Sequence, residues 1–226
     1  MKHLVLGSAG QIGDHLVTYL KKQNQDVFEY DIVNSINEDL RMTNAFELIK
    51  KYNKPFIFAS SQMSEISHST YGLLKLIGER TTQSLGGIVA RFWNVYGYEQ
   101  DEEKSHVITD FIKMAKYKGS IQMRTDGEES RQFLHADDCS ECLFILSKKY
   151  KTLNKSQPIH VTNFVWTKVI DIAKQIQLIS GCNIITNERK DQTQMNAMNK
   201  PNKNILEHWN PKTSLIEGIN KLYKTY

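Results

Sequence analysis

Residues 2–13 read Lys2-His3-Leu4-Val5-Leu6-Gly7-Ser8-Ala9-Gly10-Gln11-Ile12-Gly13, and they set the architecture expected for the whole chain. The first five residues suit a short apolar strand, and Ile12, Leu16, Val17 and Leu20 then recur on one face of a helix. Three glycines in between allow a tight turn, leave the first helical amides open to a pyrophosphate and let helix and strand pack closely. This pattern predicts the start of a dinucleotide-binding βαβ unit.

A second strand is predicted at residues 27–30, and it ends in Asp31. A carboxylate at this strand end accepts hydrogen bonds from a ribose diol and repels a 2′-phosphate, which favours NAD over NADP. The alternative role for Asp31 is that of a solvated turn residue. The cofactor-binding residues predicted from this region are Gly7, Gly10, Gln11, Ile12, Gly13 and Asp31.

Hydride-transfer chemistry is indicated further along, where an apolar strand at residues 56–59 ends in Ser60 and Ser61. Tyr71 and Lys75 lie four apart and share a helix face, so the ammonium favours the ionised form of the phenol. A serine hydroxyl at the strand end can bond the substrate oxygen that exchanges a proton with this phenol. A Tyr-Lys pair alone is also a common surface pair, so the interpretation depends on the glycine turn that precedes it.

Composition describes an ordinary globular protein of one large or two small domains, with 226 residues, 40% apolar and 24% charged. No apolar run is long enough to span a membrane and the N-terminus enters a strand at once, so we expect a cytoplasmic protein. The net charge of +4 is spread along the chain, which does not favour nucleic acid. Cys139, Cys142 and Cys182 lack a second pair for zinc, so we expect buried reduced thiols and no metal site.

Strands that alternate with helices along the rest of the chain predict an α/β fold with a doubly wound parallel sheet. Helices are expected at residues 45–51, 71–84, 107–116, 137–147, 165–178 and 205–226, and further strands at 37–41, 88–93, 121–124, 133–135 and 159–161. We assign residues 1–97 and 133–164 to a Rossmann-like NAD-binding domain. Residues 98–132 and 165–226 are assigned to a small α/β substrate lobe.

Six motifs in order resemble those of the extended short-chain dehydrogenase/reductase family, which includes the nucleotide-sugar epimerases and dehydratases. The resemblance runs over residues 1–226. The motifs are Gly7-x-x-Gly10-x-x-Gly13, the strand 56–61 with its two serines, Tyr71-Gly72-x-x-Lys75 with Gly78-Glu79, Arg91-Phe92-Trp93-Asn94-Val95-Tyr96-Gly97, residues 125–138 from Thr125-Asp126-Gly127 to His135-Ala136-Asp137-Asp138, and residues 209–218 from Trp209-Asn210-Pro211 to Gly218.

The resemblance implies that Ser61, Tyr71 and Lys75 form the catalytic triad, with Tyr71 the acid and base and Lys75 also holding the nicotinamide ribose. It implies that Asn94 and Arg131 contact the nucleotide diphosphate, where a guanidinium fork suits two oxyanions. Asp39 and Leu40 are counted with the cofactor-binding residues. An ion pair with Glu128 or Glu129 is the alternative role for Arg131, and His135 is expected to fill space in a strand.

Gln62 and Met63 follow the serine, where family members that eliminate water place an acid pair, and neither side chain can give up a proton. A 4,6-dehydratase is therefore not expected. We expect an NAD-dependent epimerase that oxidises C4 of a nucleotide-diphosphate sugar transiently. The alternatives are an NADH-dependent 4-keto-sugar reductase and a catalytically weak protein that keeps the fold and binds a partner.

The chain is shorter than this family in places, since only nine residues separate Ser61 from Tyr71 and residues 40–60 have room for one helix and one strand. We therefore expect one strand and one helix fewer than in the family. A right-handed crossover would then bring residues 56–59 beside the first strand, a displacement of Ser61 by ~4.8 Å. The resemblance also implies a homodimer formed through paired helices, including the helix of Tyr71.

Overall fold

The predicted strand, turn and helix at the N-terminus are present in the computed structural model, which describes residues 1–31, 49–51, 53–66, 69–99, 106–191 and 200–226. These residues form two compact units. Unit 1 holds Met1–Trp93, Ala136–Val161 and Asn202–Asn210, and unit 2 holds Asn94–His135, Thr162–Pro201 and Pro211–Tyr226.

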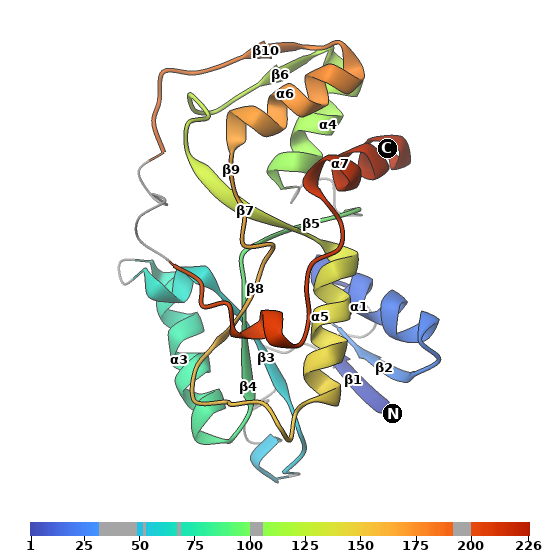
Figure 1. Cartoon of the computed structure of the whole chain (residues 1–226), viewed down its shortest axis with the longest axis vertical. Helices are drawn as coiled ribbons and strands as arrows, with labels where there is room; N and C mark the ends of the chain where they lie inside the picture. The colour runs from blue at the N-terminus through green and yellow to red at the C-terminus, as the bar shows by residue number, and fades with distance from the viewer. Residues whose placement is uncertain (32–48, 52, 67–68, 100–105, 192–199) are drawn as a thin grey trace. The chain divides into compact units, whose positions relative to one another are not determined.

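The first sheet of unit 1 pairs β1 (Lys2–Leu6) in parallel with β2 (Asp26–Tyr30), and α1 (Gln11–Lys22) connects the two strands. Helix α5 (Ala136–Lys148) packs alongside α1, as Figure 1 shows. Val5 of β1 forms a small core with Val17 and Leu20 of α1 and Phe144 of α5. Apolar residues at these helical and strand positions thus bury one face of the βαβ unit.

The second sheet of unit 1 has the order β3-β4-β8, and all of its strands are parallel. It consists of β3 (Ile57–Ser61), β4 (Ile88–Phe92) and β8 (Ile159–Val161). Every residue of the central strand β4 is buried, as expected for a parallel strand with both faces covered. The short 3₁₀ helix η2 (Gln62–Glu65) and then α3 (Thr70–Ser84) lead from β3 to β4, and α3 lies along these two strands in Figure 1.

The two sheets confirm a parallel α/β fold, but they correct one expectation about strand order. Among the described strands β1 bonds to β2 alone and β3 bonds to β4 alone, so β3 does not pair with β1. The predicted strand at 37–41 and residues 45–48 of the predicted helix lie outside the described residues. Residues 49–51 of that helix are described and are helical.

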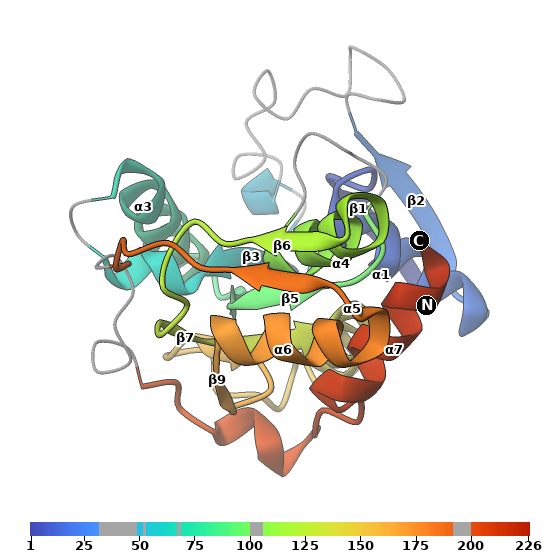
Figure 2. The same cartoon turned by 90° about the horizontal axis from the view of Figure 1, so that it is seen from above.

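Unit 2 contains a sheet of order β5-β7-β9 and a parallel pair of β6 and β10. Strand β5 (Asn94–Tyr96) pairs in parallel with β7 (Ser130–His135), and β9 (Trp166–Lys168) pairs antiparallel with β7. Strands β6 (Ser120–Gln122) and β10 (Asn183–Ile185) lie side by side in Figure 2. Helices α4 (Val107–Lys118), α6 (Val169–Ser180) and α7 (Leu215–Thr225) enclose an apolar core around Ile112, Ile172 and Ile219.

Two predicted helices are partly wrong. Residues 166–168 of the expected helix 165–178 form strand β9, because the register against β7 uses their backbone, and α6 begins only at Val169. The expected helix 205–226 is broken into η3 (Asn204–Glu207) and α7. Pro211 cannot continue a helix, and the Ser214 hydroxyl caps a new one by accepting a bond from the Glu217 amide (3.2 Å).

The boundaries of the units differ from the predicted domains at residues 94–97, 133–135 and 162–164, which belong to unit 2, and at residues 202–210, which were assigned to the substrate lobe and belong to unit 1. Trp209 Nε1 donates to Glu141 of α5, and Asn202 Nδ2 donates to the Pro158 carbonyl ahead of β8. These bonds hold the segment on unit 1. None of the helices in the described part of the chain combines the length and apolar character needed to cross a membrane.

Candidate active site

The glycine turn after β1 has the close contacts that its sequence predicts. The Gly7 amide donates to the Tyr30 carbonyl of β2 (2.8 Å), and Gly7 has a φ of +76°, which glycine adopts without strain. A Cβ at Gly13 would lie 2.0 Å from the Gly7 carbonyl oxygen, so the first turn of α1 touches the turn backbone directly. Glycine is therefore required at Gly13 by packing alone.

The Asp31 carboxylate and two buried polar side-chain atoms indicate whether this turn suits a dinucleotide. Asp31 Oδ2 accepts a bond from the Ala9 amide (3.1 Å), which fixes the carboxylate at the end of β2 beside the turn. Within the described part of the chain, Gln11 Nε2 and Ser8 Oγ are buried and have no hydrogen-bond partner. Such orphaned groups beside an open helix N-terminus fit a ligand rich in hydrogen-bonding oxygens. Asp39 and Leu40 lie outside the described residues.

Ser61 stands at the carboxyl end of β3, where parallel sheets bind ligands. Its hydroxyl accepts a bond from the Met63 amide (3.2 Å) and so caps η2. This bond uses an acceptor lone pair of the hydroxyl and leaves its hydrogen available to a substrate oxygen.

Helix α3 carries Tyr71 and Lys75, and two glycines of the same motif press it onto the elements that hold Ser61. A Cβ at Gly72 would lie 2.1 Å from the Met63 carbonyl oxygen of η2, and a Cβ at Gly78 would lie 2.3 Å from the Phe58 ring of β3. The Tyr-Gly-x-x-Lys-x-x-Gly spacing therefore brings the helix of Tyr71 and Lys75 against the serine strand within one unit.

Lys75 lies between the tyrosine and the strand. Its Nζ is 5.6 Å from the centroid of the Tyr71 ring and donates to the Ala59 carbonyl (2.8 Å). Burial lowers the pKa of the Lys75 ammonium. Tyr71 is 54% exposed, so more than half of this residue is open to solvent and to a ligand.

The Ala59 carbonyl belongs to the edge of β3 that has no described strand beside it. The Phe56 carbonyl accepts from the Ile88 amide and so points toward β4, and carbonyls alternate in direction along a strand. Ala59 O therefore points away from β4. The Lys75 ammonium thus satisfies an acceptor that a neighbouring strand would otherwise bond.

The two residues predicted to bind substrate, Asn94 and Arg131, both lie in unit 2. Asn94 Nδ2 donates to the Gln132 carbonyl (3.2 Å). Arg131 Nη1 donates to the Ser130 carbonyl (2.9 Å) and Nη2 donates to Asp191 Oδ2 (2.6 Å).

The ion-pair alternative proposed for Arg131 named the wrong partners. Glu128 pairs with Lys168 and Glu129 accepts from the Thr125 hydroxyl, whereas Asp191 holds the guanidinium. Sequence reasoning missed Asp191, which lies sixty residues from its partner. Residues 189–191 (Arg189-Lys190-Asp191) are polar and show neither helical nor strand periodicity, so their sequence does not indicate which residue Asp191 contacts.

Other predictions from the sequence are met. His135 is buried in β7, where its ring meets Tyr96 edge to face at 5.4 Å. Cys139, Cys142 and Cys182 are free and buried, and burial raises the pKa of the Cys139 and Cys142 thiols. These thiols are poor nucleophiles.

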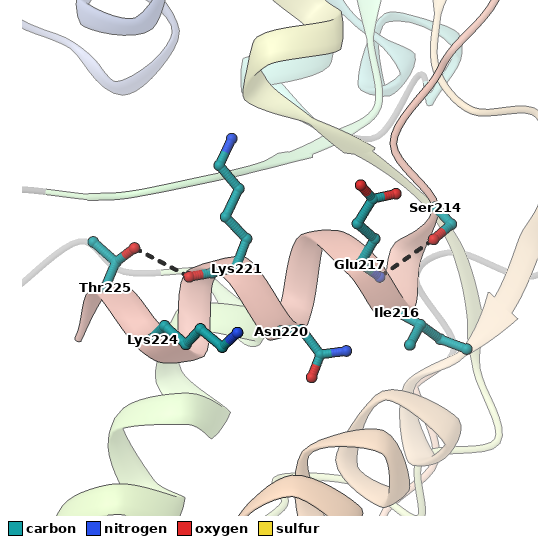
Figure 3. A pocket seen from close by; sticks show the side chains of 7 residues that line it. All are labelled: Ser214, Ile216, Glu217, Asn220, Lys221, Lys224 and Thr225. Atoms are coloured by element: carbon teal, nitrogen blue, oxygen red, sulfur yellow. Dashed lines mark hydrogen bonds between the residues drawn. The ribbon is translucent and has the colours of Figure 1, made fainter.

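An open surface pocket of about 740 Å³ lies along α7 in unit 2, and Figure 3 shows its described lining. All of the side chains drawn belong to α7 or to its N-cap, and none was predicted to bind cofactor or substrate. The lining residues are Ser214, Ile216, Glu217, Asn220, Lys221, Lys224 and Thr225.

The sequence of this chain matches a family model and several curated proteins. The sequence model of the NAD dependent epimerase/dehydratase family matches residues 34–163. A GDP-L-fucose synthase of Sinorhizobium fredii is 25% identical over 177 residues, covering 72% of this chain and 55% of that protein. A dTDP-D-glucose 4,6-dehydratase of Bos taurus is 32% identical over 149 residues, covering 62% and 40%.

Solved structures share the fold. The UDP-glucose 4-epimerase of Thermotoga maritima, solved with UDP-glucose, has a TM-score of 0.80 at 19% identity, over 99% of this chain and 98% of that chain. The dTDP-glucose 4,6-dehydratase of Bacillus anthracis, solved with NAD, also has a TM-score of 0.80, at 17% identity over 100% and 96%.

The chain spans about half the length of the curated relatives that it matches. The family model nevertheless covers more than half of this chain and includes Ser61, Tyr71, Lys75, Asn94 and Arg131. The chain therefore belongs to the NAD dependent epimerase/dehydratase family.

Proposed function

We propose that this protein is an NAD-dependent epimerase that acts on a nucleotide-diphosphate sugar through transient oxidation at C4. The observation that carries the proposal is the packing of α3 on β3 and η2, which puts Ser61, Tyr71 and Lys75 on touching elements. The solved UDP-glucose 4-epimerase of the same fold adds support from outside the chain.

The glycine turn, Asp31 and the orphaned Gln11 amide are the groups proposed to hold NAD. When bound, NAD would supply the hydride acceptor and donor that C4 chemistry needs. The open amides at the start of α1 would bind its pyrophosphate, and Asp31 would bind its adenosine ribose. Lys75 has three donors and uses one on Ala59, so the other two remain for the nicotinamide ribose.

The proton at the C4 hydroxyl is the part of the reaction assigned to side chains of this chain. Ser61 would donate a hydrogen bond to the C4 oxygen and hold it beside the Tyr71 phenol. Tyr71 would take the proton as C4 is oxidised and return it after reduction, while the Lys75 ammonium stabilises negative charge on the phenol oxygen. Gln62 and Met63 offer no acid for the loss of a neighbouring hydroxyl, which supports epimerisation over dehydration.

Asn94 and Arg131 of unit 2 are proposed to contact the diphosphate of the substrate. Arg131 presents a fork of donors, which suits two phosphate oxygens. Its bond to Asp191 would be exchanged for bonds to the substrate.

Turnover of a sugar pair tests the proposal. Purified protein supplied with NAD should interconvert UDP-glucose and UDP-galactose, or the corresponding dTDP-sugars. Tyr71→Phe should abolish this activity, whereas Tyr117→Phe, which removes the hydroxyl of an exposed helical tyrosine in unit 2, should leave it intact. No interconversion of any C4-epimeric pair by the wild type would refute the assignment.

Two other activities give different results in the same assays. A 4-keto-sugar reductase would consume NADH in proportion to the keto sugar added, whereas an epimerase would not. A catalytically weak binding protein is favoured by one observation, the use of Lys75 to bond the β3 edge. Such a protein would show, by calorimetry, either no NAD binding or NAD binding without turnover.

We also propose a homodimer that uses α3. Leu73, Leu74 and Ile77 of this helix are 44%, 63% and 63% exposed, and exposed apolar side chains grouped on one helix mark an interaction surface. Light scattering should show a dimer for the wild type and a monomer for Leu74→Glu combined with Ile77→Glu. The same pair of changes at Leu178 and Ile179 of α6, also exposed, should leave the dimer intact.

A further inference from the structure

A buried polar cluster joins the ends of β3 and β4 to α3 inside unit 1. Ser60, Glu79 and Arg91 are only 2%, 2% and 8% exposed. Arg91 donates to both carboxylate oxygens of Glu79, through Nε and Nη2, each at 2.7 Å. The Ser60 hydroxyl donates to Glu79 Oε1 at 2.6 Å.

The charges in this cluster are mutually satisfied. Burial by itself raises the pKa of the Glu79 carboxyl, but hydrogen bonds from Arg91 and Ser60 outweigh it and hold that pKa below its usual range. Burial, with a smaller effect from the Arg91 charge, lowers the pKa of the adjacent His160 to about 4, so this ring is neutral and its Nδ1 accepts from Trp93 Nε1 (3.1 Å). The cluster therefore holds one anion and one cation in fixed directions.

The members of the cluster are attached to every element that carries a candidate catalytic residue. Ser60 immediately precedes Ser61 in β3, and Glu79 follows Lys75 by one turn of α3. The remaining nitrogen of Arg91, Nη1, pairs with Glu65 at the end of η2. One guanidinium, bonded to the carboxylates of Glu79 and Glu65, thus ties together a strand end, a 3₁₀ turn and a helix.

Stability alone does not account for a buried ion pair at this position. Apolar side chains of similar volume are commonly as stabilising as a buried pair, or more so, because desolvation of the charges offsets their attraction. A two-pronged pair with a third bond from Ser60 differs in being directional. The directional bonds fix the position of the end of β3 along the axis of α3, whereas an apolar contact would allow the two elements to slide.

We infer that Glu79 is a positioning residue which, through Ser60 and Arg91, sets Ser61 against the helix that carries Tyr71 and Lys75. This inference rests on the proposed function for its catalytic consequence, although the positioning itself does not. Glu79 is fully enclosed and acts through its neighbours, not on substrate.

Ser60→Ala is the sharpest test because it removes one bond and leaves the ion pair in place. We expect amide hydrogen exchange around Met63, whose amide bonds to Ser61, to become about 10-fold faster. With a substrate pair established, kcat should fall about 10-fold to 100-fold while KM changes little, because misplacement by an ångström is costly in catalysis. The matched control is Ser140→Ala, which removes a buried hydroxyl that bonds within α5.

A second variant covers the case in which Ser60→Ala does not fold. Glu79→Met combined with Arg91→Met replaces the buried pair by apolar side chains. Glu65 also loses Arg91 in this variant, but its side chain is 34% exposed, so water can solvate the carboxylate. This double variant should fold, show faster exchange around Met63 and lose kcat more than it raises KM.

The outcomes separate the two proposals. Faster exchange around Met63 in Ser60→Ala, combined with no turnover by the wild type, supports positioning and refutes the epimerase. Unchanged exchange around Met63 in Ser60→Ala refutes positioning, whether or not the wild type turns over a substrate. An equal acceleration in Ser140→Ala also refutes it, because the effect would then be a general loosening of unit 1.

Discussion

Replacing Gly13 by alanine should separate packing of the glycine turn from binding of NAD. The added Cβ would lie 2.0 Å from the Gly7 carbonyl oxygen and 2.9 Å from both the Gly7 carbonyl carbon and Ser8 Cα. All three are backbone atoms, so no flexible side chain can move aside. The oxygen contact must open to at least 3.0 Å, which displaces the start of α1 by roughly 1 Å.

Strain of this kind costs about 1 to 3 kcal/mol in packed sites. If NAD requires the original turn, the same free energy is lost from binding, which weakens the affinity about 5-fold to 150-fold. Gly86→Ala is the matched control, since Gly86 has a φ of +74° and open space around its Cβ position. That change should cost about 1 to 2 kcal/mol of stability through the backbone alone and leave NAD affinity unchanged.

Unfolding in guanidinium chloride measures the free energy of unfolding, and isothermal titration calorimetry measures the affinity for NAD. The expected pattern is that both variants lose stability and Gly13→Ala alone loses affinity. Equal NAD affinity in wild type and Gly13→Ala would refute the view that this turn holds the pyrophosphate.

Three further perturbations test the remaining groups. Lys75→Met should lower kcat by about 10² or more, with the oligomeric state and fold of the wild type retained by light scattering and circular dichroism, since it removes the ammonium from the proposed acid and base. The hydrogen bond to Glu99 raises the pKa of His106, so the stability from this pair is fully present below the usual histidine value of 6.5 and is lost as pH rises through the raised value. Burial raises the pKa of the Glu99 carboxyl, but the hydrogen bonds from His106 together have a larger effect and leave this pKa below its usual value of 4.5. The stability that the Glu99 carboxylate contributes is therefore lost only as pH falls below 4.5. As pH rises from about 5.5 to about 8.5, the melting temperature of the wild type should therefore fall more than that of Glu99→Gln. Parallel curves of melting temperature against pH would contradict the pairing. Asp191→Asn should bind inorganic pyrophosphate more tightly than wild type in calorimetry, because it removes the negative charge beside the Arg131 guanidinium and weakens the bond that an incoming anion must displace, and unchanged affinity would argue against Arg131 as the anion site.

Local patterns predicted the elements that bear the candidate site. The strand at residues 2–6 and the helix starting near Tyr71 are found where the apolar run and the Tyr71–Lys75 spacing placed them. The failures lie where a distant partner decided the conformation. Trp166 was expected in a helix, but its backbone pairs with Gln132 of β7, and that partner is not visible in the local pattern.

The sequence by itself determined the βαβ start with its glycine turn, the tyrosine helix and the family, because spacing between near neighbours carries strand, turn and helix preferences. Only the tertiary structure decided that β1 and β3 do not pair, that Lys75 bonds the edge of β3 that faces away from β4, and that Glu79 bonds both Ser60 and Arg91. The physical reason is that hydrogen bonds and ion pairs between residues far apart in the chain depend on which buried groups meet, and a buried polar group must take the partner that the fold brings to it.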